Sequence, residues 1–87
     1  MKKNVLLTGA TGGIGKAICS KLKNYNLVVV SRNEEKLKNF MKDNKLIIKR
    51  ITCDLKDPTQ ITKMIEEVIS SNLNIDILVN NAGVTND

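Results

Sequence analysis

The chain has 87 residues, of which 41% are hydrophobic and 26% charged, and it carries a formal net charge of +5. These values fit one globular domain with a modest core, and no apolar run approaches the roughly 20 residues that span a bilayer. The lysines are spread along the chain without interleaved aromatic side chains, so we expect a solvated basic surface. Neither a nucleic-acid partner nor a membrane is predicted.

The chain contains two cysteines, Cys19 and Cys53, and no histidine. The spacing of these cysteines fits neither a metal site nor a redox motif, so no metal ligand is predicted. Reduced thiols are typical of a cytosolic protein. Residues 1–4 include two lysines and are followed by an apolar run that ends at Thr8. This run is too short for the apolar core of a signal peptide. We therefore expect a cytoplasmic protein.

The first half of the chain alternates apolar runs with amphipathic segments. A strand is predicted over residues 4–8, followed by a glycine-rich turn and a helix from 13 to about 23. The uninterrupted apolar run 27–30 predicts a second strand that is buried on both faces. A second helix, which Asn33 caps, is expected to end at residues 43–44.

The second half continues the alternation. A third strand is predicted over residues 46–53, and the two basic residues that interrupt it favour a place at the sheet edge. Asp57 and Pro58 are a typical helix start, with Gln60 placed for a capping box. The last strand is predicted over residues 75–79. The helix before it has the clearest amphipathic pattern in the chain, formed by Ile61, Met64, Ile65, Val68 and Ile69.

This order of elements predicts an α/β fold, namely a Rossmann-like doubly wound parallel sheet with three helices on its two faces. Right-handed crossovers give its four strands the order 3-2-1-4. Tyr25 and Phe40 are the only aromatic residues, so the core must be aliphatic. We expect residues 1–87 to form one unit, the dinucleotide-binding part of such a domain.

Four of the five glycines lie between Gly9 and Gly15, directly after the first strand. Glycine allows the backbone to approach a ligand closely, and the helix that follows directs its unpaired N–H groups at the same turn. A preceding strand and a following helix are the context that a dinucleotide fingerprint requires. We therefore expect a phosphate site here. The alternative is a tight strand-to-helix turn without a ligand.

At these residues the chain resembles the short-chain dehydrogenase/reductase family, and most of all its bacterial 3-oxoacyl-acyl-carrier-protein reductases. The segment Thr8–Gly15 matches the family motif Thr-Gly-x-x-x-Gly-x-Gly. Its glycines also fit the Gly-x-x-Gly-x-x-Gly spacing of a longer, epimerase-like branch, but Asn80–Gly83 reads Asn-Asn-Ala-Gly, as in the shorter branch. Ser31-Arg32, Asp54-Leu55 and Gly83-Val84-Thr85 agree as well. The resemblance covers the whole chain but only the first part of a family member.

The resemblance implies a site for a nicotinamide dinucleotide. An NAD-preferring site places a carboxylate after the second strand, whereas Ser31 and Arg32 suit the 2′-phosphate of NADP(H), which we therefore expect rather than NAD(H). A solvated arginine close to Glu34 is the alternative for Arg32. The implied cofactor-binding residues are Gly9, Thr11, Gly12, Gly13, Ile14, Gly15, Ser31, Arg32, Asp54, Leu55, Asn80, Asn81, Ala82 and Gly83.

Particular roles follow from the same resemblance. Asp54 is expected to accept a hydrogen bond from the adenine amine, and Leu55 to pack on the base; the alternative for Asp54 is a carboxylate that only shapes a turn. Asn80 is expected to stabilise the central strand beside the cofactor. Asn81 could equally be a turn residue that contacts no ligand.

No catalytic residue is predicted. In the family, a tyrosine hydroxyl delivers the proton, a lysine within the motif Tyr-x-x-x-Lys lowers the pKa of that hydroxyl, and a serine orients the substrate carbonyl. The only tyrosine here is Tyr25, and Val29 stands where that lysine would be. We further expect Tyr25 to lie before the second strand, at the end of a helix that points away from the site. The chain alone is therefore predicted to be inactive.

Several functions stay open. The first is the N-terminal NADP(H)-binding part of a reductase that converts 3-oxoacyl thioesters to 3-hydroxyacyl thioesters in fatty acid synthesis; the intact family members use acyl-carrier-protein-linked substrates and are usually homo-oligomers. Such a piece could arise from a truncated gene, a split gene or a partial sequence. The others are a non-catalytic nucleotide-binding module and a truncated remnant that does not fold alone, because its fourth strand leaves an apolar edge.

Overall fold

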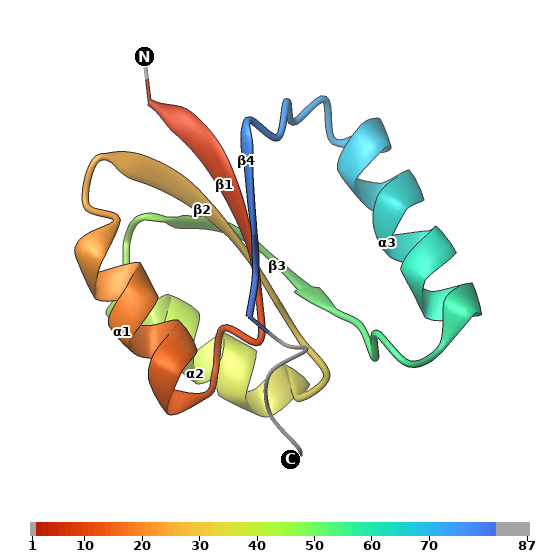
Figure 1. Cartoon of the computed structure of the whole chain (residues 1–87), viewed down its shortest axis with the longest axis horizontal. Helices are drawn as coiled ribbons and strands as arrows, with labels where there is room; N and C mark the ends of the chain where they lie inside the picture. Colours follow the sequence, from red (N-terminus) through yellow and green to blue (C-terminus); the bar gives the residue numbers. More distant parts are fainter. Residues whose placement is uncertain (1, 82–87) are drawn as a thin grey trace.

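The protein is a parallel sheet with helices on both faces, as predicted (Figure 1). The computed structural model describes residues 2–81. The strands lie in the order β3-β2-β1-β4, and each neighbouring pair is parallel. The elements in chain order are β1 (Lys3–Thr8), α1 (Gly13–Lys21), β2 (Tyr25–Ser31), α2 (Glu34–Asp43), β3 (Ile47–Thr52), α3 (Pro58–Ser70) and β4 (Ile77–Asn80).

The core has two layers because successive side chains of a strand point to opposite faces of the sheet. One layer lies between the sheet and the helices α1 and α2, and it contains Leu7, Leu27 and Leu37, all fully buried. The other lies between the sheet and α3, and it contains Val28 and Val30. Figure 1 shows α1 and α2 together on one side of the sheet and α3 on the other. The predicted aliphatic core is confirmed.

Strand β3 lies at the sheet edge, as predicted, and it contains an irregularity that the sequence pattern did not indicate. Leu27 of β2 pairs with Ile47, but the next residue of β2 pairs with Lys49, so that Ile48 is passed over. One extra residue reverses the alternation of side chains along a strand. As a result Ile47 packs towards α1 and α2 while Ile51 packs towards α3, and Ile48 is 42% exposed.

Both predicted helix caps are present, but the predicted capping box is wrong. The side chain of Asn33 accepts a hydrogen bond from the Lys36 N–H (3.0 Å), and that of Asp57 caps the first turn of α3. In a capping box the side chain of Gln60 would return to the Asp57 N–H. Instead it accepts from the N–H of Asp54 (2.8 Å), outside the helix, while the Asp57 N–H donates to the Asp54 carbonyl (3.0 Å).

One correction to the predicted boundaries concerns Tyr25. This residue does not precede the second strand, because β2 begins at Tyr25, which pairs with Lys3 at the amino end of the sheet. The pairing extends to the next residues, where the side-chain amide of Asn26 donates to the Asn4 side chain (3.1 Å). Helix α1 correspondingly ends at Lys21, earlier than expected.

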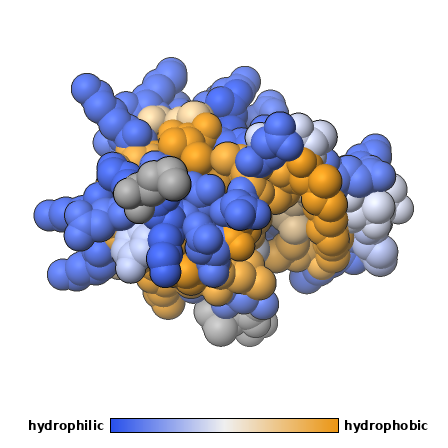
Figure 2. Space-filling view, turned by 90° about the horizontal axis from the view of Figure 1, so that it is seen from above, coloured by the Kyte–Doolittle hydropathy of each residue, from blue (hydrophilic) through white to orange (hydrophobic). Residues whose placement is uncertain are grey.

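Helix α3 covers its face of the sheet only in part. Its residues Ile61, Met64 and Val68 pack against the second core layer, but Ile65 and Ile69 of the same apolar pattern are 51% and 69% exposed. Leu78 of the edge strand β4 is 64% exposed. Apolar side chains accordingly reach the surface on the side of the molecule where α3 lies (Figure 2). None of the helices in residues 2–81 has the length and apolar character that a membrane crossing requires.

Candidate functional site

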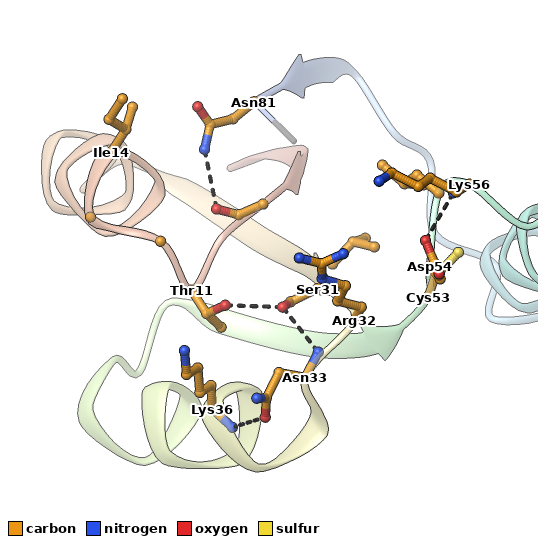
Figure 3. A pocket seen from close by; sticks show the side chains of 15 residues that line it. Thr11, Ile14, Ser31, Arg32, Asn33, Lys36, Cys53, Asp54, Lys56 and Asn81 are labelled. Atoms are coloured by element: carbon orange, nitrogen blue, oxygen red, sulfur yellow. Dashed lines mark hydrogen bonds between the residues drawn. The ribbon is translucent and has the colours of Figure 1, made fainter. Parts of the chain in front are cut away.

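A cleft of about 570 Å³ opens beyond the carboxyl ends of β1, β2 and β3 (Figure 3). Its size falls within the range of about 300–1,000 Å³ that is common for small-molecule sites. In open parallel sheets, ligands bind at this end, where the chain changes its direction of winding. Here that point lies between β1 and β4, since β2 and β3 extend the sheet one way and β4 the other.

The floor of the cleft begins with a tight turn after β1. Gly9 has a φ of 66°, a conformation that glycine adopts without strain. The N–H of Gly12 closes the turn on the Gly9 carbonyl (3.4 Å), and the Ala10 N–H donates to the Val30 carbonyl of the neighbouring strand (3.3 Å). The backbone conformation of this turn is thus tied to the end of β2.

The two glycines at the start of α1 have different surroundings. A Cβ atom at Gly15 would overlap the Gly9 carbonyl oxygen and lie 2.8 Å from the Ala10 Cα, so only glycine allows the helix to pack this closely on the turn. A Cβ atom at Gly13 would meet no atom within 4 Å, so this position faces open space. The Gly12 N-cap offers no side chain, and the first turn holds no acidic residue, so the N–H groups that open α1 are available to an anion.

Residues at the end of β4 hold the turn from the other side. The Thr8 hydroxyl donates to the Asn80 side chain (3.0 Å) and accepts from the Asn81 N–H (3.0 Å). The Asn81 side chain, nearly buried, donates to the Gly9 carbonyl (3.1 Å). Both asparagines therefore support the glycine turn. The other two predicted site residues of this segment, Ala82 and Gly83, lie outside the described residues.

A pair of hydroxyl groups joins the glycine turn to the end of β2. The side-chain oxygens of Thr11 and Ser31 are 2.9 Å apart and hydrogen-bonded. Ser31 also accepts from the backbone N–H of Asn33 (3.2 Å), which is the N-cap of α2. This chain of contacts fixes the start of α2 next to the glycine turn.

Three cationic side chains line the same cleft. Arg32 follows β2, Lys36 lies in the first turn of α2, and Lys56 lies in the turn after β3. In Figure 3 the Lys36 side chain runs towards Thr11, the Arg32 side chain lies beside Ser31, and Lys56 lies on the far side, near Asp54. Glu34 does not line this cleft, and its carboxylate pairs with Lys38 (3.8 Å).

The remaining wall is formed by residues that follow β3. Leu55 gives it an apolar surface, and Asp54, whose side chain accepts from the Lys56 N–H (3.0 Å), supplies a carboxylate. Cys53 is buried beneath them, and its N–H donates to the Ser31 carbonyl (2.9 Å). Burial, and then the neighbouring carboxylates of Asp54 and Asp57, raise the pKa of the Cys53 thiol, so it stays neutral near pH 7.

The structure brings together most of the residues that the sequence predicted. Gly15 and Asn80 support the cleft without lining it. The predicted residues that line it are Gly9, Thr11, Gly12, Gly13, Ile14, Ser31, Arg32, Asp54, Leu55 and Asn81. Lining residues that the sequence reasoning missed are Val30, Asn33, Lys36, Cys53 and Lys56. The position of Lys36 could have been found from the predicted Asn33 cap, which places it in the first turn of a helix that starts at the cleft.

Two further observations bear on chemistry. Tyr25 lies at the amino end of β2, at the end of the sheet opposite the cleft. Within residues 2–81, no three metal-binding side chains gather in one place.

The strand order, the glycine turn and the cleft at the switch point are those of a Rossmann-type fold. A sequence profile of the short chain dehydrogenase family matches residues 3–87. The chain belongs to this family, whose members use a nicotinamide dinucleotide cofactor.

Curated relatives agree with this assignment. The chain is 36% identical to the acetoacetyl-CoA reductase of Acinetobacter sp. (strain RA3849), over 99% of its own length and 38% of that of the relative. It is 39% identical to the 3-oxoacyl-[acyl-carrier-protein] reductase FabG of Rickettsia typhi, over 98% of its length and 34% of that of the relative. The chain thus spans little more than a third of the length of these relatives.

Solved structures of the same class share the fold. The crystal structure of 2-keto-3-deoxy-D-gluconate dehydrogenase from Streptococcus agalactiae superposes with a TM-score of 0.79 at 31% identity, over 95% of this chain and 33% of that one. Serine dehydrogenase from Escherichia coli gives a TM-score of 0.78 at 28% identity, over 90% of this chain and 37% of that one.

Proposed function

We propose that residues 1–87 bind the adenosine and diphosphate half of NADP(H). The observation that carries this proposal is the charge at the end of β2. Arg32 and Lys36 line the cleft there, whereas Asp54, the one carboxylate that lines it among residues 2–81, lies on the wall formed after β3. A site for NAD(H) would place a carboxylate after β2 to bind the ribose 2′-hydroxyl, whereas cations suit a 2′-phosphate.

The other parts of the cleft fit the rest of this half of the cofactor. The N–H groups that open α1 face an open space at Gly13, which allows a diphosphate to approach the backbone. The apolar Leu55 and the Asp54 carboxylate suit a purine with an exocyclic amine. Ile14, which is 59% exposed, offers both a backbone N–H and an apolar surface at the mouth. When bound, the cofactor supplies or accepts a hydride.

We further propose that the complete protein is a reductase of 3-oxoacyl thioesters. The support is the printed activity of the curated relatives, which reduce 3-oxoacyl-[acyl-carrier-protein] and acetoacetyl-CoA. The present residues contribute cofactor binding and no general acid, since the sequence contains no histidine and its only tyrosine lies away from the cleft. We therefore expect no reduction of a 3-oxoacyl thioester by this chain alone.

Isothermal titration of the chain with NADP and with NAD tests the cofactor proposal. We expect NADP to bind at least ten-fold more tightly, and Arg32→Ala to reduce the affinity for NADP to nearly that for NAD. Arg50→Ala is the matched control, because Arg50 lies on β3, outside the cleft, and its guanidinium contacts the Met41 sulfur. Equal affinities, or tighter binding of NAD, would reject the preference. Absence of saturable binding to either would reject the site.

A second candidate is a nucleotide-binding module without chemistry. It is favoured by the fact that every recognised motif of the chain serves binding. Reading the coding DNA beyond codon 87 separates the two. A Ser and a Tyr-x-x-x-Lys in the same or a shifted frame supports the reductase, and their absence supports the module.

A further inference from the structure

Gln60 connects the first turn of α3 to the wall of the cleft. Its side-chain oxygen accepts a hydrogen bond from the Asp54 N–H (2.8 Å), and its side-chain nitrogen donates to the Asp57 carboxylate (3.2 Å). Gln60 itself does not line the cleft. It therefore acts on the cleft only through the residues that it holds.

The turn between β3 and α3 depends on this contact. Its backbone is closed by the bond from the Asp57 N–H to the Asp54 carbonyl (3.0 Å), and the Asp54 side chain is oriented by the Lys56 N–H (3.0 Å). The Asp54 N–H lies beyond the end of β3 and outside its pairing with β2, and its acceptor is the Gln60 side chain. A backbone N–H in a partly buried place needs an acceptor, and Gln60 supplies it.

The same turn presents the groups that would distinguish one nucleobase from another. A carboxylate accepts a hydrogen bond from the 6-amino group of adenine but repels the 6-oxo group of hypoxanthine. This selection works only if the carboxylate is held at a fixed distance from the base that rests on Leu55. The Gln60 contact fixes the backbone from which the Asp54 side chain extends.

We propose that Gln60 is a positioning residue for adenine recognition, acting through the Asp54 N–H. The proposal rests on the NADP(H) function proposed above. A loss of Gln60 is expected to loosen the turn and to make the cleft less selective at position 6 of the purine. It need not change the preference for the 2′-phosphate, because Arg32 and Lys36 belong to other elements.

The test compares the affinities of NADP and nicotinamide hypoxanthine dinucleotide phosphate, which differ in the 6-amino group and in the proton that N1 gains when an oxo group replaces it. We expect the unaltered chain to prefer NADP at least ten-fold, and Gln60→Met to reduce this ratio at least three-fold. General destabilisation lowers both affinities equally and leaves the ratio unchanged. Gln60→Glu combined with Asp57→Asn keeps an acceptor for the Asp54 N–H and avoids two facing carboxylates at the 3.2 Å contact between residues 60 and 57, so this double variant should retain the ratio.

Thr62→Val is the matched control, because Thr62 lies on the same helix, is exposed, and donates only to the Pro58 carbonyl (3.1 Å). If Gln60→Met does not fold, Gln60→Asn, whose shorter side chain withdraws the oxygen from Asp54, replaces it. If folded Gln60→Met has the same ratio of affinities for the two dinucleotides as the unaltered chain, the proposal is overturned. It is also overturned if the unaltered chain binds both dinucleotides equally well. Failure to bind NADP, or to prefer it over NAD, overturns the proposed function instead.

Discussion

Replacing Gly15 by alanine tests how the glycine turn and α1 fit together. An added Cβ would overlap the carbonyl oxygen of Gly9 and lie 2.8 and 2.9 Å from the Cα and carbonyl carbon of Ala10. All these atoms belong to the backbone of a turn that is itself bonded to β2. The overlap can be relieved only if the helix moves away from the turn.

The expected change in the free energy of unfolding on Gly15→Ala is the difference between a stabilising and a destabilising contribution. Alanine in place of glycine stabilises a helix interior by about 1 kcal/mol. Forcing an additional carbon into a packed region costs about 1–3 kcal/mol, and a rigid backbone partner places this case at the upper end. We expect the free energy of unfolding to fall by about 2 kcal/mol, or the melting temperature by roughly 8–16 °C for a domain of this size.

Urea unfolding monitored by circular dichroism measures this change, and Gly13→Ala is the control. A Cβ at Gly13 meets no atom within 4 Å, so the free energy of unfolding of the Gly13→Ala variant should be unchanged or slightly higher than that of the unaltered chain. The same Cβ would stand where the diphosphate is proposed to lie, and Gly13→Ala should therefore weaken NADP binding at least ten-fold. A Gly15→Ala protein as stable as the unaltered chain would refute this description of the packing.

Three further predictions concern other parts of the molecule. Lys36→Gln should lower the affinity for NADP about 5–10-fold and leave that for NAD unchanged, as measured by titration, whereas Lys42→Gln, near the end of the same helix, should change neither. Burial raises the pKa of the Cys19 thiol from 9.0 to about 11, so this thiol ionises at lower pH in the unfolded chain than in the folded one. The free energy of unfolding should therefore fall by up to about 2–3 kcal/mol between pH 9 and 11. Cys19→Ala should flatten this part of the plot of stability against pH, and an unchanged slope would contradict the prediction. Because Ile69 and Leu78 are largely exposed, the chain should associate in sedimentation experiments at high concentration, and replacing both residues by lysine should reduce this association. Equal association of the double variant would contradict the prediction.

Much of the fold could be predicted because local and global signals agree. The apolar runs of β1 and β2 and the caps at Asn33 and Asp57 each determine one element, and the right-handed crossover then leaves one strand order. The glycine turn could be predicted equally well, because a strand before it and a helix after it fix its place beside the sheet.

The remaining features depend on pairing and packing between distant segments. The irregularity at Ile48 is set by its register with β2, and the extension of β2 to Tyr25 by its pairing with β1. The helix-start pattern is compatible with two N–H donors to the Gln60 side-chain oxygen, those of Asp57 and Asp54, and only the path of the preceding turn decides between them. Exposure of Ile69 could not be foreseen from periodicity, which shows an apolar face but not what covers it.

The central claim is that a dinucleotide phosphate lies against the N–H groups that open α1, with its adenosine between the ends of β2 and β3. Amide chemical shifts of the ¹⁵N-labelled chain during titration with NADP test this directly. We predict that the largest saturable changes occur at Gly13, Ile14, Arg32 and Leu55, with a smaller response at Arg32 for NAD. Saturable binding with its largest changes on other elements, for example on α3, would contradict the account.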